Sequence, residues 1–114
     1  MRALKMAKLK GFQKRYLRGL AHNLKPAIMI GRKGLSGALL KSAERAIMKH
    51  ELIKVKFNDF KEKGQKAKIS GRIARETGSE VAGTIGHTVI FFREQDDHEK
   101  RKVILPRRDR TDEP

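Results

Sequence analysis

The sequence predicts a single α/β (α+β) domain in which three helices pack against a mixed four-stranded sheet. Its length, 114 residues, is that of one domain. Segments with apolar residues at helical spacing alternate with short apolar or alternating segments, which indicates helices between strands. Two later segments, 80–85 and 88–93, are joined by Gly86-His87 as in a β-hairpin. The expected order is helix, strand, helix, strand, helix, strand, strand, with parallel strands joined through helices and one antiparallel strand added by the hairpin.

The first half of the chain accounts for two helices and one strand. Residues 6–22 repeat apolar residues at helical spacing. This helix must end before Lys25-Pro26, because proline disfavours the helical conformation in the residue before it. The apolar run 27–30, followed by Gly31, predicts a short buried strand. Residues 36–50 return to helical spacing with one apolar face.

The second half accounts for the remaining helix and strands. Residues 52–58 alternate apolar residues with lysine, which predicts a strand with one wet face. Residues 61–77 have a weaker helical pattern, because glycine interrupts it twice, and Gly78 is placed to cap it. KVILP, 102–106, is expected to add a last short strand. Residues 1–107 are expected to form the domain and 108–114 a mobile charged tail.

Charge is the strongest feature of the composition. The chain has 28 Lys and Arg against 13 Asp and Glu, a net charge of +15, and 11 basic residues precede the first acidic residue, Glu44. Such a one-sign region indicates a polyanionic partner, of which nucleic acid is the commonest. An anionic membrane is the other candidate, but it requires an amphipathic helix with a free apolar face, and here the core needs that face.

Several classes of protein are excluded or disfavoured. The chain has no cysteine, which excludes disulfides, thiolate metal sites and a cysteine nucleophile. No apolar stretch is long enough to span a bilayer and no signal-peptide core is present, so a soluble, cytoplasmic protein is expected. No spare apolar face is evident, so we expect a monomer.

The segment Gly31-Arg32-Lys33-Gly34, here called the GRKG loop, lies between the predicted strand 27–30 and the following helix. Glycines allow close approach of a ligand, a helix start favours an anion, and the two cations could bind a phosphate. The alternative is a tight turn with two solvated cations. The loop is not a nucleoside-triphosphate loop, because Leu35 follows where Ser or Thr is needed, and no dinucleotide fingerprint opens the helix.

Rows of basic residues follow each predicted helix. They could form one continuous RNA-facing surface or three ordinary solvated faces. Like charges at this spacing repel, and the first two rows have no acidic partners, which favours a function. In the third helix, Glu62 and Glu76 add acidic charge, so the pattern favours neither the RNA-facing surface nor the ordinary solvated face. The rows are Lys10, Lys14 and Arg18; Lys41, Arg45 and Lys49; and Lys68, Arg72 and Arg75.

No catalytic or metal-binding set can be assembled. The four histidines are scattered singly at expected helix ends and turns, so no enzyme activity, metal, cofactor or small-molecule substrate is expected. The methionines at 6, 29 and 48 are interpreted as core residues. Most aromatic residues have core spacing, although Tyr16, Phe57 or Phe60 could stack on a base if exposed.

Four segments together resemble the CRM domain, a family named for chloroplast RNA splicing and ribosome maturation that includes small bacterial single-domain proteins of the YhbY type. They are LRGLAHNLKPAIMIGRKGLS, HELIKVKF, ARETGSEVAGTIGHTVIFFR and ILPR, which run in order from Leu17 to Arg107. The basic residues before Leu9 and the tail after Arg107 do not belong to the family pattern.

The resemblance implies a two-layer domain similar to the C-terminal domain of translation initiation factor three. It also implies RNA binding through the GxxG loop and nearby basic helix surfaces, with ribosomal RNA of large-subunit precursors as the partner. A general structured-RNA or DNA-binding protein is the alternative. The residues implicated are Gly31, Arg32, Lys33 and Gly34 in the loop, with Lys14, Arg15, Arg18, Lys25, Lys41, Arg45, Arg72 and Arg75 around it.

Overall fold

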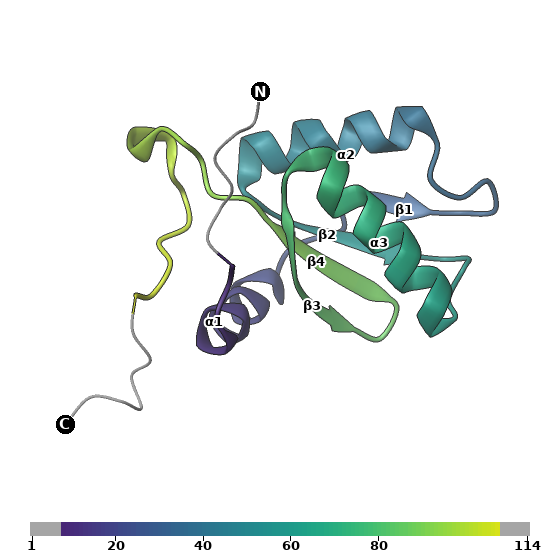
Figure 1. Cartoon of the computed structure of the whole chain (residues 1–114), viewed down its shortest axis with the longest axis horizontal. Helices are drawn as coiled ribbons and strands as arrows, with labels where there is room; N and C mark the ends of the chain where they lie inside the picture. Colours follow the sequence, from purple (N-terminus) through teal and green to yellow (C-terminus); the bar gives the residue numbers. More distant parts are fainter. Residues whose placement is uncertain (1–7, 108–114) are drawn as a thin grey trace.

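The computed structural model describes residues 8–107, and the seven predicted elements occur in the predicted order (Figure 1). The first seven residues and the tail at 108–114 lie outside the described part of the chain, so the mobile tail stays a prediction. The elements are α1 Gly11–Ala21, β1 Ile28–Ile30, α2 Gly37–His50, β2 Leu52–Phe57, α3 Lys63–Thr77, β3 Glu80–Ile85, β4 Thr88–Phe92 and a short 3-10 helix, η1 His98–Lys100.

The four strands form one mixed sheet in the order β1-β2-β4-β3. β1 pairs with β2 in parallel, while β4 is antiparallel to both of its neighbours, β2 and β3. Strands β1, β2 and β3 therefore run in the same direction, and the last strand is inserted between β2 and β3. This is the mixed sheet with one antiparallel strand that the sequence predicts; the insertion of β4 inside the sheet is an additional finding.

The sheet carries a core on each face, because successive side chains of a strand point to opposite faces. Helices α2 and α3 cover the face that contains Val55 and Phe91. Helix α1 covers part of the other face, where Ile90 and Phe92 pack with the C-terminal segment. In Figure 1, α2 lies along the top of the view and α1 at the lower left, with the strands between them. The sheet and the α2–α3 layer form the expected two layers, and α1 adds to the opposite side.

The start of α1 is fixed by hydrogen bonds to distant segments. The amide of Leu9 donates to both carboxylate oxygens of Glu80 in β3, at 3.0 and 3.1 Å. The side chain of Gln13 accepts from the amide of Lys10 and donates to the carbonyl oxygen of Pro106, each at 3.0 Å. Because Lys10 has extended torsions, α1 begins at Gly11, later than the sequence pattern predicts.

The predicted strand at 102–106 is wrong, since the segment has no strand conformation. The amides of Lys102 and Val103 donate instead to one carboxylate oxygen of Glu51, at 2.7 and 2.8 Å. Val103 and Leu105 still pack in the core beneath α1. The alternation of apolar residues in KVILP thus reports burial on one side, which an irregular segment achieves as well as a strand.

The interpretation of the methionines as core residues is also wrong for two of them. Met29 in β1 and Met48 in α2 are each 52% exposed. Both occupy elements whose neighbouring residues are buried, since Ile28 and Ile30 flank Met29 and Ile47 precedes Met48. The third, Met6, lies outside the described residues.

Candidate nucleic-acid interface

The GRKG loop is a closed four-residue turn that presents its two cations to solvent. The amide of Gly34 donates to the carbonyl oxygen of Gly31 at 2.9 Å, so Arg32 and Lys33 occupy the two central positions. Both side chains are exposed, and neither has a hydrogen-bond or ion-pair partner among residues 8–107. The turn follows β1 directly, so its position is set by the buried Ile30.

The two glycines of the loop differ in whether the backbone conformation requires glycine. Gly34 has a φ of +71°, a conformation that side chains with a Cβ rarely adopt, and the ring of Phe60 lies against it. Gly31 has no such torsion, and a Cβ built on it would meet no atom within 4 Å. Gly34 is therefore required by the backbone, whereas Gly31 leaves open space in which a ligand can approach the main chain.

The base of the loop is held by the connection between β2 and α3. The amides of Asn58 and Asp59 both donate to the carbonyl oxygen of Ile30, at 2.9 and 3.1 Å. Phe60, with a φ of +56°, places its ring beneath Gly34. These contacts fix the end of β1, so the cations at the tip project from a rigid base.

Helix α2 begins shortly after the loop and adds an electrostatically favourable end. The hydroxyl of Ser36 accepts from the amide of Leu39 at 3.1 Å, which is an ordinary N-cap. The first turn of α2 contains no acidic residue. The positive end of the helix dipole therefore faces no carboxylate of its own turn.

The basic residues predicted on the helices divide between the two sides of the sheet. Helices α2 and α3 pack against each other on one side, and their candidate residues are exposed there. Helix α1 packs on the other side, so its row does not join the same surface. The first group, here called the α2–α3 cations, comprises Lys41, Arg45, Arg72 and Arg75; the second comprises Lys14, Arg15 and Arg18.

Lys25 lies at the opposite end of β1 from the GRKG loop, because it precedes the strand and the loop follows it. It is exposed beside Pro26. The hypothesis of one continuous surface over three helices is therefore wrong for the α1 row. A contact of Lys25 or of the α1 row with RNA stays a prediction. The loop and the start of α2, with Lys41 in its second turn, do lie at one end of the sheet.

Sequence patterns singled out none of the lysines between β2 and α3. The hydrogen bonds from Asn58 and Asp59 to Ile30 bring this connection beside the loop. Lys61 in the connection and Lys63 at the start of α3 are exposed. Lys66 has a structural partner, since its ammonium donates to the carbonyl oxygen of Gly86 at 2.9 Å. The prediction that β2 follows β1 in parallel could have identified these lysines, because the ends of parallel strands meet at one edge.

Of the three aromatic residues considered for base stacking, one is excluded. Phe57 is 1% exposed, and Phe60 is partly buried beneath the loop. Tyr16 on α1 is 41% exposed. Neither remaining aromatic residue combines high exposure with a position at the loop.

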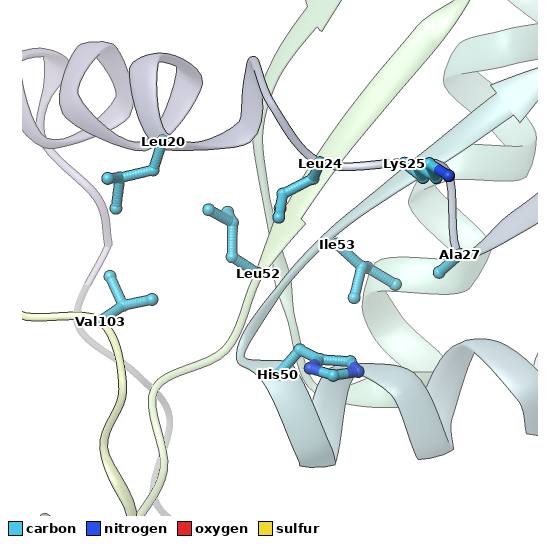
Figure 2. A pocket seen from close by; sticks show the side chains of 8 residues that line it. All are labelled: Leu20, Leu24, Lys25, Ala27, His50, Leu52, Ile53 and Val103. Atoms are coloured by element: carbon cyan, nitrogen blue, oxygen red, sulfur yellow. The ribbon is translucent and has the colours of Figure 1, made fainter.

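A hollow of about 410 Å³ lies between the end of α1, the end of α2 and the C-terminal segment. Figure 2 shows leucine side chains from several segments around it, with His50 on one side. Among the described residues that line it, Lys25 and His50 are titratable and none is a carboxylate.

Neither a metal site nor a membrane span is found in the described part of the chain. No three His, Asp or Glu residues between 8 and 107 are grouped as metal ligands. No helix in that range is both long and apolar enough to cross a bilayer. The histidines lie at helix ends and turns, as predicted: His22 follows α1, His50 ends α2, His87 is in the β3–β4 turn and His98 starts η1.

Comparison with known proteins places this chain among relatives that are named as RNA-binding proteins. The family model of the CRS1/YhbY (CRM) domain matches residues 9–93. A protein of Haemophilus influenzae named "RNA-binding protein" is 40% identical over 103 residues, which cover 90% of this chain and 100% of the relative. "Probable RNA-binding protein YqeI" of Bacillus subtilis is 32% identical over 98 residues, which cover 86% of this chain and 99% of that one.

A solved structure has the same fold. The solution structure of the hypothetical protein SAV1595 from Staphylococcus aureus aligns with a TM-score of 0.73 and 32% identity, over 87% of this chain and 100% of that one. The relatives above are named as RNA-binding proteins and not as enzymes, in agreement with the predicted lack of catalytic chemistry. The family match spans the GRKG loop, all three α-helices and the whole sheet. The chain belongs to the CRS1/YhbY (CRM) domain family.

Proposed function

We propose that this protein binds RNA through the GRKG loop and the α2–α3 cations, and that its target is ribosomal RNA in precursors of the large ribosomal subunit. It acts there as a monomeric, cytoplasmic assembly factor without catalytic activity. The observation that carries the proposal is the pair of exposed cations, Arg32 and Lys33, which lie at the tip of a fixed turn and have no partner among residues 8–107. The names of the relatives support RNA as the polyanion.

The loop has the chemistry of a phosphate site. The open side of Gly31 lets a phosphate approach the main chain. Arg32 can donate two parallel hydrogen bonds to phosphate oxygens, and Lys33 adds a second charge. The N-terminus of α2 contributes the positive end of its dipole.

The α2–α3 cations extend this site along the neighbouring backbone of the RNA. Contacts to phosphate fix position and carry little sequence information, so recognition depends on RNA shape and on 2′-hydroxyl groups. Lys14 and Arg15, on the other side of the sheet, contribute to the long-range field that attracts the polyanion.

Sedimentation of cell extract through a gradient tests the partner and the loop together. The natural protein is expected to travel with large-subunit precursors, and a folded Arg32→Ala, Lys33→Ala variant is expected to remain at the top. Co-sedimentation of both proteins would support the ribosomal partner and would show that the loop cations are not needed for binding to it. If neither travels with the precursors, the ribosomal target is wrong.

The charge of the chain is equally compatible with binding to DNA or to other structured RNA. Competition between matched RNA and DNA duplexes separates these alternatives, because a protein that uses 2′-hydroxyl groups prefers RNA at equal charge. Equal competition by the two duplexes would favour the general nucleic-acid-binding alternative.

A further inference from the structure

One row of the sheet remains open on the side that α1 covers. Cross-strand pairing places Met29 beside Lys56, Lys56 beside Thr88, and Thr88 beside Ile85, so these four residues cross all four strands on one face. Met29 is 52% exposed and Ile85 is 54% exposed, although both belong to strands. Neighbouring strands lie about 4.8 Å apart, so the row is roughly 14 Å wide.

Helix α1 and its side chains cover the neighbouring row of this face and leave the open row uncovered. The next row on this face contains Lys54, Ile90 and Gly83, and the stem of Arg18 lies over Gly83, where an added Cβ would come within 2.6 Å of it. Lys54 donates to the carbonyl oxygen of Leu24 at 2.7 Å. The open row and its border are here called the sheet platform: Met29, Lys56, Thr88 and Ile85, with Lys54 and Arg18.

The platform combines apolar contact area with positive charge. Lys56 is exposed and has no hydrogen-bond or ion-pair partner within the described range. Glu80 is the only acidic residue in the four strands, and its carboxylate is occupied by the amide of Leu9. A partner that fits this surface is flat and apolar on one part and anionic on another.

The platform is continuous with the GRKG loop. Met29 is followed by Ile30 and then by Gly31, and the carboxamide of Asn58 beside the loop contacts the sulfur of Met29 at 3.5 Å. An RNA strand whose phosphate is held at the loop therefore has the open row next to it.

We propose that the sheet platform binds unpaired nucleotides that extend from the RNA held at the GRKG loop. Bases lie on Met29 and Ile85, and the phosphates between them meet Lys56 and Arg18. Four-stranded sheets that carry aromatic residues on one face stack two or three bases there; on this platform Met29 and Ile85 provide apolar contact in place of aromatic rings. The proposal rests on the proposed RNA-binding function and adds the substrate class: RNA in which a single-stranded segment adjoins a structured one.

Three RNA probes separate base contacts from charge: a blunt hairpin, the same hairpin with a short uridine tail, and the hairpin with an abasic tail of equal length. The natural protein is expected to bind the uridine-tailed hairpin about tenfold more tightly than the blunt one. The abasic tail carries the same charge without bases and is expected to give a clearly smaller gain. Equal gains from both tails would overturn the proposal.

A matched pair of variants locates the effect. Met29→Ser with Ile85→Ser removes the apolar part of the platform, while Met48→Ser with Ile104→Ser removes the same side chains at exposed positions elsewhere. The platform variant is expected to lose the preference for the uridine tail and keep its affinity for the blunt hairpin. The control variant is expected to retain both. Loss of the preference in both variants, or in neither, would overturn the proposal.

A measurement on the natural protein avoids any doubt about folding. On addition of a uridine oligonucleotide, the methyl NMR signals of Met29 and Ile85 are expected to shift, while those of Met48 and Ile104 stay in place. Uniform shifts, or shifts confined to the control methyls, contradict the platform. If the Arg32→Ala, Lys33→Ala variant binds every probe as well as the natural protein, binding through the GRKG loop is contradicted, and the proposed function with it. The preference for the uridine tail is still tested by the platform variant and its control.

Discussion

The charged side chains at the two ends of β2 differ in burial and in hydrogen bonding. At one end, Glu51 is fully buried, and its carboxylate accepts hydrogen bonds from the amides of Gln95, Lys102 and Val103. At the other, beside the end of β1, Arg32 and Lys33 are exposed without partners between residues 8 and 107. A residue at positive φ lies near each end, Glu51 before β2 and Phe60 after it.

The difference separates structural charge from charge that is available to a ligand. A buried carboxylate is tolerated only when hydrogen bonds replace its water, and Glu51 meets that condition through three backbone amides. Exposed cations without partners contribute little to stability, so their placement on a fixed turn needs another reason.

The largest expected effect on stability is at Glu51. Replacement Glu51→Ala leaves three amides without their acceptor and should lower the free energy of unfolding by about 3 kcal/mol. Urea denaturation measures this change. Replacement of an exposed acid, Glu99→Ala, should change stability by less than about 0.5 kcal/mol. Equal effects of the two substitutions would show that the buried carboxylate has no special role.

The largest expected effect on binding is that of salt. If about six phosphates are neutralised, affinity for RNA should fall roughly a thousandfold between low and moderate salt. Titration at several salt concentrations gives the slope of log affinity against log salt. A slope shallower than about −2 contradicts a phosphate-dominated interface.

Removing the loop cations should affect binding and leave stability unchanged. The Arg32→Ala, Lys33→Ala variant should bind RNA about tenfold to a hundredfold more weakly and have a shallower salt slope. Its free energy of unfolding should stay within about 0.5 kcal/mol. The control is Lys100→Ala with Lys102→Ala, which removes the same charge from exposed side chains near Glu51. A loss of affinity as large in the control would show that only net charge matters.

The smallest effects distinguish the two glycines of the loop. Gly34→Ala should destabilise the protein by about 1 kcal/mol, because φ is +71° and alanine avoids that region. Gly31→Ala should leave stability nearly unchanged, since a Cβ there has no neighbour within 4 Å, and should weaken RNA binding. Unfolding and binding measured on both variants check this. Weaker binding by Gly34→Ala alone would place the ligand on the other side of the turn.

Much of the fold follows from local patterns in the sequence. The helical spacing, the alternation in 52–57, the glycine cap at Gly78 and the glycine turn at Gly86 fix the elements and their order, because each depends on neighbouring residues. The side of the sheet on which α1 packs and the place of β4 depend on contacts between distant segments, which spacing does not encode. For the same reason Val103 and Leu105 were expected in a strand.

The candidate site was predicted in part. The loop could be located because a buried run, two glycines and two cations are adjacent in the sequence. The sequence left open whether the basic rows form one surface, but α1 lies across the sheet from α2 and α3, so Lys14 and Arg18 face a different side from Lys41. Met29 appeared to be core because its neighbours Ile28 and Ile30 are buried, and only the cross-strand row reveals its exposure.

The bonds between Glu51 and the segment 95–103 also have a consequence for biosynthesis. A nascent chain that has already produced all four strands still lacks Val103 and Leu105 beneath α1, and its Glu51 lacks the amides of Lys102 and Val103. The domain therefore completes its core only after this segment leaves the ribosome. Chains that stop before this segment expose apolar surface and leave Glu51 without two of its hydrogen-bond donors. Such chains are substrates for chaperones and proteases.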